Sequence, residues 1–339
     1  MLQRHRREEW EEHDKHVGED GQWFLARVEG AGAPAEIRSL PEVQVLKTVW
    51  AQQFREAEGK IVYQAGTSYD GHTQIQTPPD PEARYSRKRV QEWVGGKVQV
   101  TETEDEGYPH LITDIAGTCS SKTDYEALSE IQQRLEERGC LPEKQYVDSG
   151  YMSGPNLAAS RKKNIALFGP ACPVVSNQSK LPNGITTEQF VIDPDKQSAS
   201  CPAGFTANLE YNRKGKLRFR FPDEGCAGCP LCERCCTGKR GRTVCVRLTY
   251  PLLQEARQRQ KTEEFKKEYH QHRSGVEGCL SALARGNGMR ISRYSGNRKR
   301  HLQAMFTGSA ANLKRVAHWL AGERPKRCRH PWELEKQPA

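Results

Sequence analysis

Two carboxylates, Asp148 and Glu277, stand where acidic side chains could hold metal ions beside a phosphodiester. Asp148 ends the predicted strand 145–148 and precedes a Ser-Gly turn, which places it at the carboxyl edge of a sheet, where open α/β folds put their chemistry. Glu277 is followed by a basic stretch with no acidic residue before Glu323. Two-metal phosphoryl transfer requires carboxylates that hold the ions and cations that clamp the anionic backbone. The plain alternatives are a turn-forming Asp and a salt-bridged helix Glu.

Basic residues gather after Glu277 and are interleaved with Tyr294 and His301. Such cations contact phosphates and give an affinity that falls with salt, without sequence information. A solvated helix face normally alternates in sign, whereas this stretch does not, which favours contact with DNA. The residues predicted to bind DNA are Arg285, Arg290, Arg293, Arg298, Lys299 and Arg300.

The charge of the whole chain is divided unevenly. Among the 339 residues, 52 are Lys or Arg and 43 are Asp or Glu, for a formal net charge of +9. Residues 201–339 hold 29 of the basic and 12 of the acidic residues, so this part carries +17 and residues 1–200 carry −8. Such an asymmetry indicates a polyanionic partner for the C-terminal part.

Hydropathy argues against a membrane. Mean hydropathy is −0.83, no apolar run approaches the roughly 20 residues needed to span a bilayer, and the N-terminal residues form no apolar signal segment. We therefore expect a soluble, cytoplasmic protein. With 35% hydrophobic and 28% charged residues, the chain has enough apolar material for one good core and a poorer region, in about two domains.

Cysteines form a second candidate metal site. Five of the twelve cysteines fall between Cys226 and Cys236, with CxxC spacings, and Cys201 lies upstream. Thiolates two residues apart in a turn can meet one tetrahedral Zn²⁺, and without an export signal such a cluster indicates a metal site rather than a disulfide framework. The alternative is a set of reduced, buried thiols.

Local sequence signals predict the elements that must position these residues. The alternation over 96–103, the acidic turn EDEGYP and the segment HLITDI (110–115) predict a hairpin, and the capping box Thr123–Glu126 starts a helix that stops at Gly139. A strand at 145–148, a helix over 153–163 and a strand at 165–168 follow. Another capping signal predicts a helix from Ser39 whose apolar residues are Val43, Leu46, Trp50 and Phe54.

The remainder of the chain changes character twice. Residues 171–250 contain short strand-like pieces and Gly or Pro turns, and the pattern becomes helical again after Pro251, through Phe265 and Tyr269. A last helix is predicted after a Gly-rich basic link. Its apolar side would consist of Leu302, Met305, Phe306, Leu313, Val316 and Leu320.

Taken together, these motifs resemble the DDE transposases of bacterial insertion sequences. The resemblance runs from about Leu40 to Leu320 and rests on motifs in the right order. They are DPEARYSRKR (80–89), PHLIT (109–113), YVDSGY (146–151), FKKEY (265–269), RSGVEG (273–278) and HLQAMFTGSAANLKR (301–315). The resemblance implies a ribonuclease H-like mixed sheet flanked by helices, with a β-rich, Cys-containing insertion.

The resemblance also implies roles for individual residues. The family's second Asp falls on Asp148 and its Glu on Glu277, which would hold Mg²⁺ or Mn²⁺. The preceding Tyr and Arg would be Tyr269 and Arg273, and the downstream basic residue Arg285. Three residues separate Tyr269 from Arg273 where the family has two, and one extra residue rotates a helix by about 100°. Tyr269 is therefore expected to lie off the face that the family uses.

The family pattern has a first Asp on a central strand, and no convincing counterpart precedes the hairpin. We expect the chain to be an N-terminally truncated transposase, catalytically impaired because that Asp is absent. The family resemblance further implies a structural Zn²⁺ at Cys201, Cys226, Cys229 and Cys235, DNA partners at the transposon ends and target, and a homo-oligomer in the intact enzyme. The alternatives are a non-catalytic DNA-binding remnant or regulator, and a zinc-dependent binding module with incidental carboxylates.

Five segments are predicted from these patterns. They are an N-terminal arm and helix (1–75), the first part of the ribonuclease H-like core (76–170), the insertion (171–250), a C-terminal helical part that carries the Glu (251–322) and a basic tail (323–339).

Overall fold

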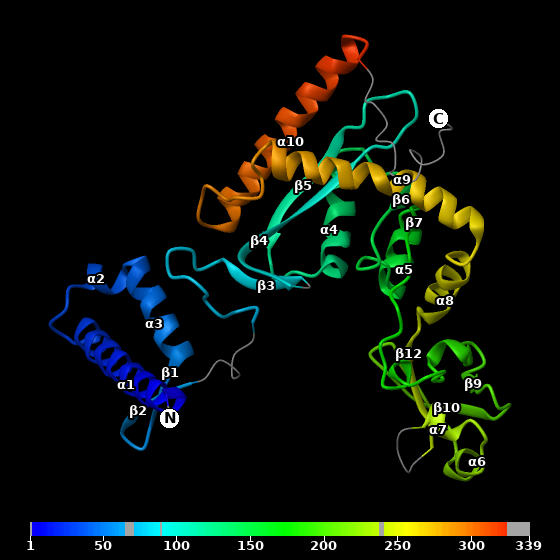
Figure 1. Ribbon diagram of the computed structural model, residues 1–339, viewed down its shortest axis with the longest axis horizontal. Helices are drawn as coiled ribbons and strands as arrows, with labels where there is room; N and C mark the ends of the chain where they lie inside the picture. Colours follow the sequence, from blue (N-terminus) through cyan, green and yellow to red (C-terminus); the bar gives the residue numbers. More distant parts are fainter. Residues whose placement is uncertain (1, 65–70, 89, 237–240, 324–339) are drawn as a thin grey trace. The chain divides into compact units, whose positions relative to one another are not determined.

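The computed structural model describes residues 2–64, 71–88, 90–236 and 241–323 (Figure 1). Helices and strands alternate along it, which confirms the predicted α/β class. The chain divides into two compact units, with residues 1–122 and 280–339 in unit one and residues 123–279 in unit two. The described strands form four separate sheets, one parallel and three antiparallel.

Unit one begins with helices packed on a small hairpin. The predicted helix after Ser39 is present as α3, but the predicted cap is wrong: α3 begins at Pro41 with Leu40 as its N-cap and no side-chain cap, because Ser39 ends α2 and its Oγ donates to the Glu36 carbonyl. The helix ends at Gln53, and Phe54 already belongs to a strand. The polar N-terminal arm is a long helix, α1, and Trp50 Nε1 donates to the Gly18 carbonyl of that helix at 2.9 Å. The elements are α1 (Leu2–Glu29), α2 (Ala35–Ser39), α3 (Pro41–Gln53), β1 (Phe54–Ala57) and β2 (Lys60–Tyr63).

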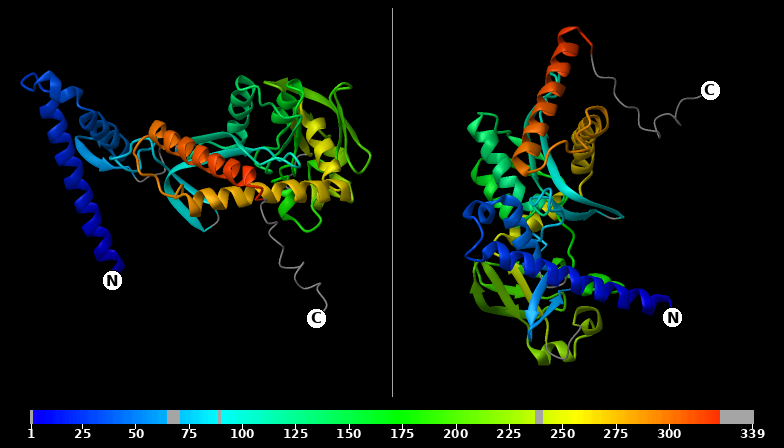
Figure 2. Two further views of the ribbon diagram at one scale, coloured as in Figure 1. Left: turned by 90° about the horizontal axis from the view of Figure 1, so that it is seen from above. Right: turned by 90° about the vertical axis from the view of Figure 1, so that its left-hand side faces the viewer.

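A three-stranded antiparallel sheet forms the rest of unit one. The predicted hairpin is confirmed, because Val100 of one strand lies opposite Ile115 of the next. The order is β3-β4-β5, and a long helix, α10, lies along β5 (Figures 1 and 2). The elements are β3 (Arg84–Lys88), β4 (Gln91–Glu102), β5 (Ile112–Cys119) and α10 (Asn297–Leu320).

The predicted apolar side of α10 is wrong as a buried face. Its buried residues are Ala304 and Gly308, and a Cβ added at Gly308 would meet Ile115 Cδ1 at 3.2 Å. Small residues let the helix axis approach the sheet, so larger side chains are turned outward. Leu302, Met305, Phe306, Leu313 and Leu320 are all exposed, and only Val316 of the predicted set is half-buried.

Asn312 fixes α10 to the start of β5 through one residue's backbone. Its Oδ1 accepts from the Ile112 amide and its Nδ2 donates to the Ile112 carbonyl, each at 2.8 Å. We expect Asn312→Ala to lower the free energy of unfolding of unit one by about 2 kcal/mol, because both backbone groups lose their partner. Chemical denaturation measures this loss. Leu313→Ala, at a side chain 73% exposed, is the matched control, and equal losses in the two variants would contradict the assignment.

Unit two starts with a helix and a short parallel strand pair. The predicted capping box is present, since Thr123 and Glu126 each bond the other's backbone amide. The two predicted strands pair in parallel, with Gln145 opposite Leu167, and their crossover helix begins at the predicted cap Ser153. Leu128, Met152 and Leu167 share the core beneath them. The elements are α4 (Asp124–Glu137), β6 (Lys144–Tyr146), α5 (Gly154–Lys162) and β7 (Ala166–Phe168).

A five-stranded antiparallel sheet follows, in the order β12-β11-β10-β9-β8. Its core is formed by Phe190, Phe219 and Phe221, all at most 1% exposed. Its strands β8 and β11, which contain Ile192 and Phe219, fall within 171–250, where short strand-like pieces were predicted. The elements are η1 (Gln178–Lys180), η2 (Thr187–Gln189), β8 (Val191–Asp193), β9 (Ser198–Ser200), β10 (Thr206–Arg213), β11 (Lys216–Arg220), α6 (Asp223–Ala227), α7 (Cys232–Cys235) and β12 (Thr243–Arg247).

Two helices close unit two. They are α8 (Tyr250–Arg259) and α9 (Glu263–Ser281), and α9 continues into the π-helical turn η3 (Ala282–Gly286), which confirms the predicted helical region after Pro251. π-Turns inside helices are frequent at functional sites. Within the described part of the chain, no helix combines the length and apolarity that crossing a bilayer requires.

Candidate functional site

Asp148 lies just beyond β6 and is held by Arg273 of α9. The guanidinium donates two hydrogen bonds to the carboxylate, from Nε to Oδ1 at 2.8 Å and from Nη2 to Oδ2 at 2.9 Å. The Asp148 side chain is 52% exposed and that of Arg273 only 16%. A bidentate Arg–carboxylate pair is geometrically specific. It therefore fixes the position of α9 relative to the end of β6.

Tyr269 lies one helical turn before Arg273 and contacts the same strand end. Its hydroxyl donates to the Val147 carbonyl at 3.2 Å. The expectation that Tyr269 lies off the Arg273 face is wrong for this helix, because a spacing of four residues returns to nearly the same face. Burial, followed by the charge of Asp148, raises the pKa of Tyr269, so this hydroxyl stays protonated as a donor.

Glu277 lies one further turn along α9 and is exposed. Its charge acts on both Arg273 and Tyr269, as does that of Asp148. Burial alone would lower the pKa of Arg273, but the hydrogen bonds and charge of Asp148, with the charge of Glu277, raise it overall. Arg273 is thus a permanent cation between two carboxylates.

An ion-paired network that the sequence did not reveal anchors α9 to β6. Glu268 accepts from Tyr146 Oη at 2.6 Å and from Lys144 Nζ at 2.5 Å. The His272 ring stacks on the Tyr146 ring with centroids 4.5 Å apart. The hydrogen bonds from Lys144 and Tyr146 lower the pKa of Glu268. These contacts join residues more than 120 positions apart, and no local pattern indicates them.

The lowered pKa of Glu268 makes this anchor dependent on pH. Its stabilisation is complete above the ordinary Glu pKa, about 4.3, and is lost as the pH falls through the lower folded value. We expect Glu268→Gln to lower the melting temperature at pH 7. The difference from wild type should shrink as the pH falls below about 4.3 and should close once the pH has passed the lower folded pKa. Melting curves across pH test this. Glu263→Gln, on the same helix with a side chain 84% exposed, should change little at any pH, and a difference that persists at low pH would contradict the prediction.

Asp148 and Glu277 are oxygen donors of the kind that hard divalent cations prefer. Mg²⁺ is often held by one or two carboxylates, with water and substrate phosphates completing its shell. Among the described residues, no group of three or more His, Cys, Asp or Glu side chains is arranged to hold a metal ion. Asp148 and Glu277 are therefore of the right chemical type for such an ion, with water and phosphate supplying the other oxygens.

The basic residues predicted to contact DNA differ in accessibility. Arg300 forms an ion pair with Asp80, and its side chain is 9% exposed. Asp80 and Glu82 belong to the DPEAR segment. Asp80 also accepts a hydrogen bond from the backbone amide of Gly296, and Glu82 accepts one from that of Asn297, at the start of α10. The sequence did not indicate this capping role. The others, Arg285, Arg290, Arg293, Arg298 and Lys299, are exposed.

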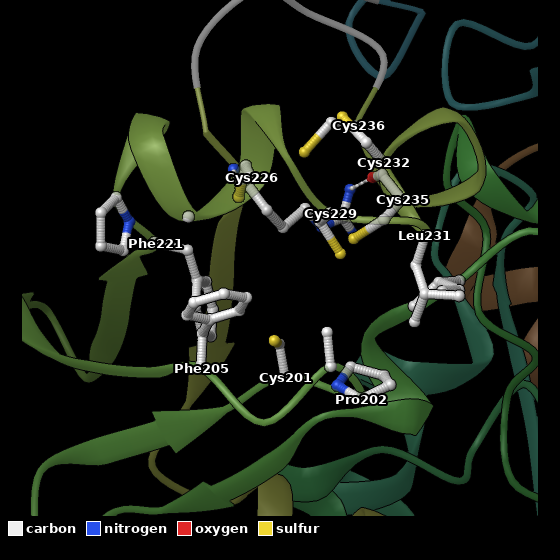
Figure 3. A pocket seen from close by; sticks show the side chains of 15 residues that line it. Cys201, Pro202, Phe205, Phe221, Cys226, Cys229, Leu231, Cys232, Cys235 and Cys236 are labelled. Carbon is white, nitrogen blue, oxygen red and sulfur yellow. Dashed lines mark hydrogen bonds between the residues drawn. The ribbon is translucent and has the colours of Figure 1, made fainter.

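The cysteines gather around one small pocket of about 30 Å³ in unit two (Figure 3). Those that line it are Cys201, Cys226, Cys229, Cys232, Cys235 and Cys236. Burial, and then the neighbouring Cys226 and Cys235, raise the pKa of Cys236 to about 12. The thiols are of the right chemical type for Zn²⁺, but no three of the described cysteines are yet arranged around one ion.

Comparison with known proteins identifies one family over part of the chain. Residues 200–317 match the family model described as "Transposase DDE domain". The matched range includes α9 with Tyr269, Arg273 and Glu277, the cysteine pocket and most of α10, whereas Asp148 lies before it. Neither the curated proteins nor the solved structures gave a match.

Proposed function

We propose that the chain carries the DNA cleavage and strand-transfer site of a transposase, because residues 200–317 match the transposase DDE domain family model. The observation that carries the proposal is the Asp148–Arg273 pair, with Glu277 one turn beyond it on α9. It brings a carboxylate and an obligate cation together just beyond β6, with a second carboxylate one turn away on α9. DNA is the substrate that the family implies.

In this proposal, Asp148 and Glu277 hold Mg²⁺ or Mn²⁺, which supplies Lewis-acid activation and charge neutralisation at the scissile phosphate when bound. Arg273 leaves Asp148 for the phosphate. Its planar guanidinium can donate two parallel hydrogen bonds to the non-bridging phosphate oxygens. Tyr269 holds the Val147 carbonyl and thereby the direction of Asp148. Arg285, at the end of η3, contacts the DNA backbone.

We further propose that catalysis by this chain alone is impaired. Two ions about 3.5–4 Å apart need shared and terminal carboxylates, and two described acids cannot supply them. The order of β4, β5, α4, β6, α5 and β7 supports a ribonuclease H-like core.

Mn²⁺ binding to the full chain tests the site. We expect weak binding, followed by electron paramagnetic resonance, that is lost in Asp148→Asn and in Glu277→Gln but retained in Asp195→Asn, an exposed acid of unit two. Binding that survives both site substitutions would refute the site. Supercoiled plasmid incubated with Mn²⁺ should stay intact, and nicking that requires Asp148 would refute the impairment alone.

A second candidate is a non-catalytic DNA-binding regulator, which the engagement of both Asp148 oxygens by Arg273 favours. In that case the pair is structural. Asp148→Asn would then lower the melting temperature and leave DNA affinity and its dependence on Mn²⁺ unchanged. Under the strand-transfer proposal, the same substitution removes the Mn²⁺ dependence of DNA binding.

We also propose a structural Zn²⁺ at Cys201, Cys226, Cys229 and Cys235. Support comes from the shared pocket, into which residues from two separate segments bring their thiols. Metal analysis of the purified chain should give about one zinc, reduced in Cys235→Ser and unchanged in Cys245→Ser, an exposed cysteine of β12 outside the pocket. Well under one zinc per wild-type chain would favour reduced thiols instead.

A further inference from the structure

A groove of about 950 Å³ in unit one is separate from the carboxylates described above. One wall is β4, from Gln91 to Val98, and the other is the segment 289–295 that leads into α10. Gly96 and Gly117 also line it. A Cβ added at Gly117 would meet the His301 backbone at 3.0 Å, so α10 packs closely on the sheet beside the groove. We call this cleft the Trp93 groove.

Aromatic side chains stand on both walls of the Trp93 groove. Trp93 comes from β4 and is half-buried, and Tyr294 comes from the opposite segment and is 55% exposed. An exposed aromatic face in a groove offers a stacking surface, and every nucleic-acid base has a π-face that can use it. With a ring on each wall, one base can stack on either ring, or two successive bases can each stack on one of them.

The charge of the groove is positive where it remains open to a ligand. Arg290 and Arg293 line it and are exposed, and Lys97 joins them from β4. Its two acidic residues are already paired, Asp80 with Arg300 and Glu92 with Arg87 at 3.5 Å. Cations beside aromatic rings are the combination that binds single-stranded nucleic acid, with arginines on the phosphates and rings on the bases.

The size of the groove selects between paired and unpaired strands. Its volume is at the upper end of the roughly 300–1,000 Å³ typical of small-molecule sites. A duplex keeps its base faces stacked inside, so the rings of Trp93 and Tyr294 could not reach them. An unpaired nucleotide or two exposes those faces and fits a concavity of this size.

We propose that the Trp93 groove binds unpaired nucleotides of a DNA strand, with bases stacked on Trp93 and Tyr294 and phosphates at Arg290 and Arg293. The inference rests on the proposed action on DNA ends, and it adds a site that captures a frayed or displaced strand. Trp93 and Tyr294 then discriminate strand state, whereas the arginines supply affinity for any strand.

Fluorescence anisotropy with a labelled single strand and with its duplex, using the full chain without added divalent ions, tests the proposal. We expect Trp93→Ala and Tyr294→Ala each to weaken single-strand binding about tenfold, within the roughly 1–3 kcal/mol per stacked base, and to leave duplex binding within twofold. Trp93→Phe should restore most of the affinity. Arg293→Gln should weaken both ligands.

Tyr108→Ala is the matched control, since Tyr108 is an exposed tyrosine of unit one outside the groove. Single-strand affinity within twofold of wild type in Tyr294→Ala, or an equal loss for single strand and duplex, overturns the proposal. Tyr294 is exposed, so this arm holds even where Trp93→Ala fails to fold. Because no metal is present, failure of the Mn²⁺ site would leave the result unaffected, and the two proposals fail separately.

Discussion

Replacing Arg273 by Gln is expected to strengthen Mn²⁺ binding at Asp148 about tenfold and to abolish the gain in DNA affinity that Mn²⁺ brings. In the wild-type chain the guanidinium occupies both oxygens of Asp148, so an ion must displace it. Charge-assisted hydrogen bonds contribute about 1.5–3 kcal/mol. If displacing Arg273 costs the ion about 1.4 kcal/mol of binding free energy, removing Arg273 raises Mn²⁺ affinity about tenfold. The displaced cation is also the group proposed to bind phosphate.

The opposite signs of these two effects make the Arg273 experiment sharp. If Arg273 had only a structural role, its replacement would lower both Mn²⁺ affinity and the Mn²⁺-dependent gain in DNA affinity, through general destabilisation. Arg161→Gln is the control, because Arg161 pairs with Glu255 in the same unit with both side chains about two-thirds exposed. It should change neither Mn²⁺ affinity nor its effect on DNA binding. Weaker Mn²⁺ binding in Arg273→Gln would show that Arg273 supports the carboxylate geometry rather than competing for it.

Adding one methyl group at Gly169 is expected to destabilise unit two by about 2–3 kcal/mol and to weaken Mn²⁺ binding at Asp148. Gly169 follows β7, and a Cβ there would lie 2.3 Å from the Val147 carbonyl oxygen. That oxygen accepts the hydrogen bond from the Tyr269 hydroxyl, and Val147 directly precedes Asp148 in the chain. The backbone must shift to relieve the clash, and such overpacking typically costs about 1–3 kcal/mol.

Gly278 provides the matched substitution for Gly169. It lies in α9 beside Glu277, and a Cβ there would meet nothing within 4 Å. Gly278→Ala should stabilise the chain by about 0.5–1 kcal/mol through helix propensity. Denaturation curves and Mn²⁺ titrations of both variants measure the contrast. Equal stability of the two variants would mean that the β6–β7 end tolerates displacement and does not fix Asp148.

Signals confined to a few residues gave most of the secondary structure. The capping box at Thr123, the cap at Ser153 and the alternation over 96–103 are each complete within one turn or one strand, and all three elements are present. The apolar side of α10 could not be obtained this way. A stripe of large side chains and a stripe of small ones both have helical spacing, and the close approach permitted by Gly308 decided between them.

The candidate site divides along the same line. Asp148 and Glu277 were chosen by residue type, local context and family resemblance, whereas their tie through Arg273 became visible only in three dimensions. Glu268, Lys144 and Tyr146 were missed because each is unremarkable among its neighbours in sequence. The family spacing suggested that Tyr269 lies off this face, but four-residue steps back from Glu277 through Arg273 reach Tyr269 on the same side of α9.

The outward side of α10 carries apolar side chains on a helix without a single acidic residue. At low ionic strength, like charges on Arg298, Lys299 and Lys314 hold two such helices apart. The range of that repulsion falls from about 10 Å at 0.1 M salt to about 3 Å at 1 M. High salt is the usual means of stripping nucleic acid from a basic protein. It therefore allows Phe306 and Leu313 of one molecule to contact the same side chains of another. Colloidal stability should therefore fall as the salt concentration rises.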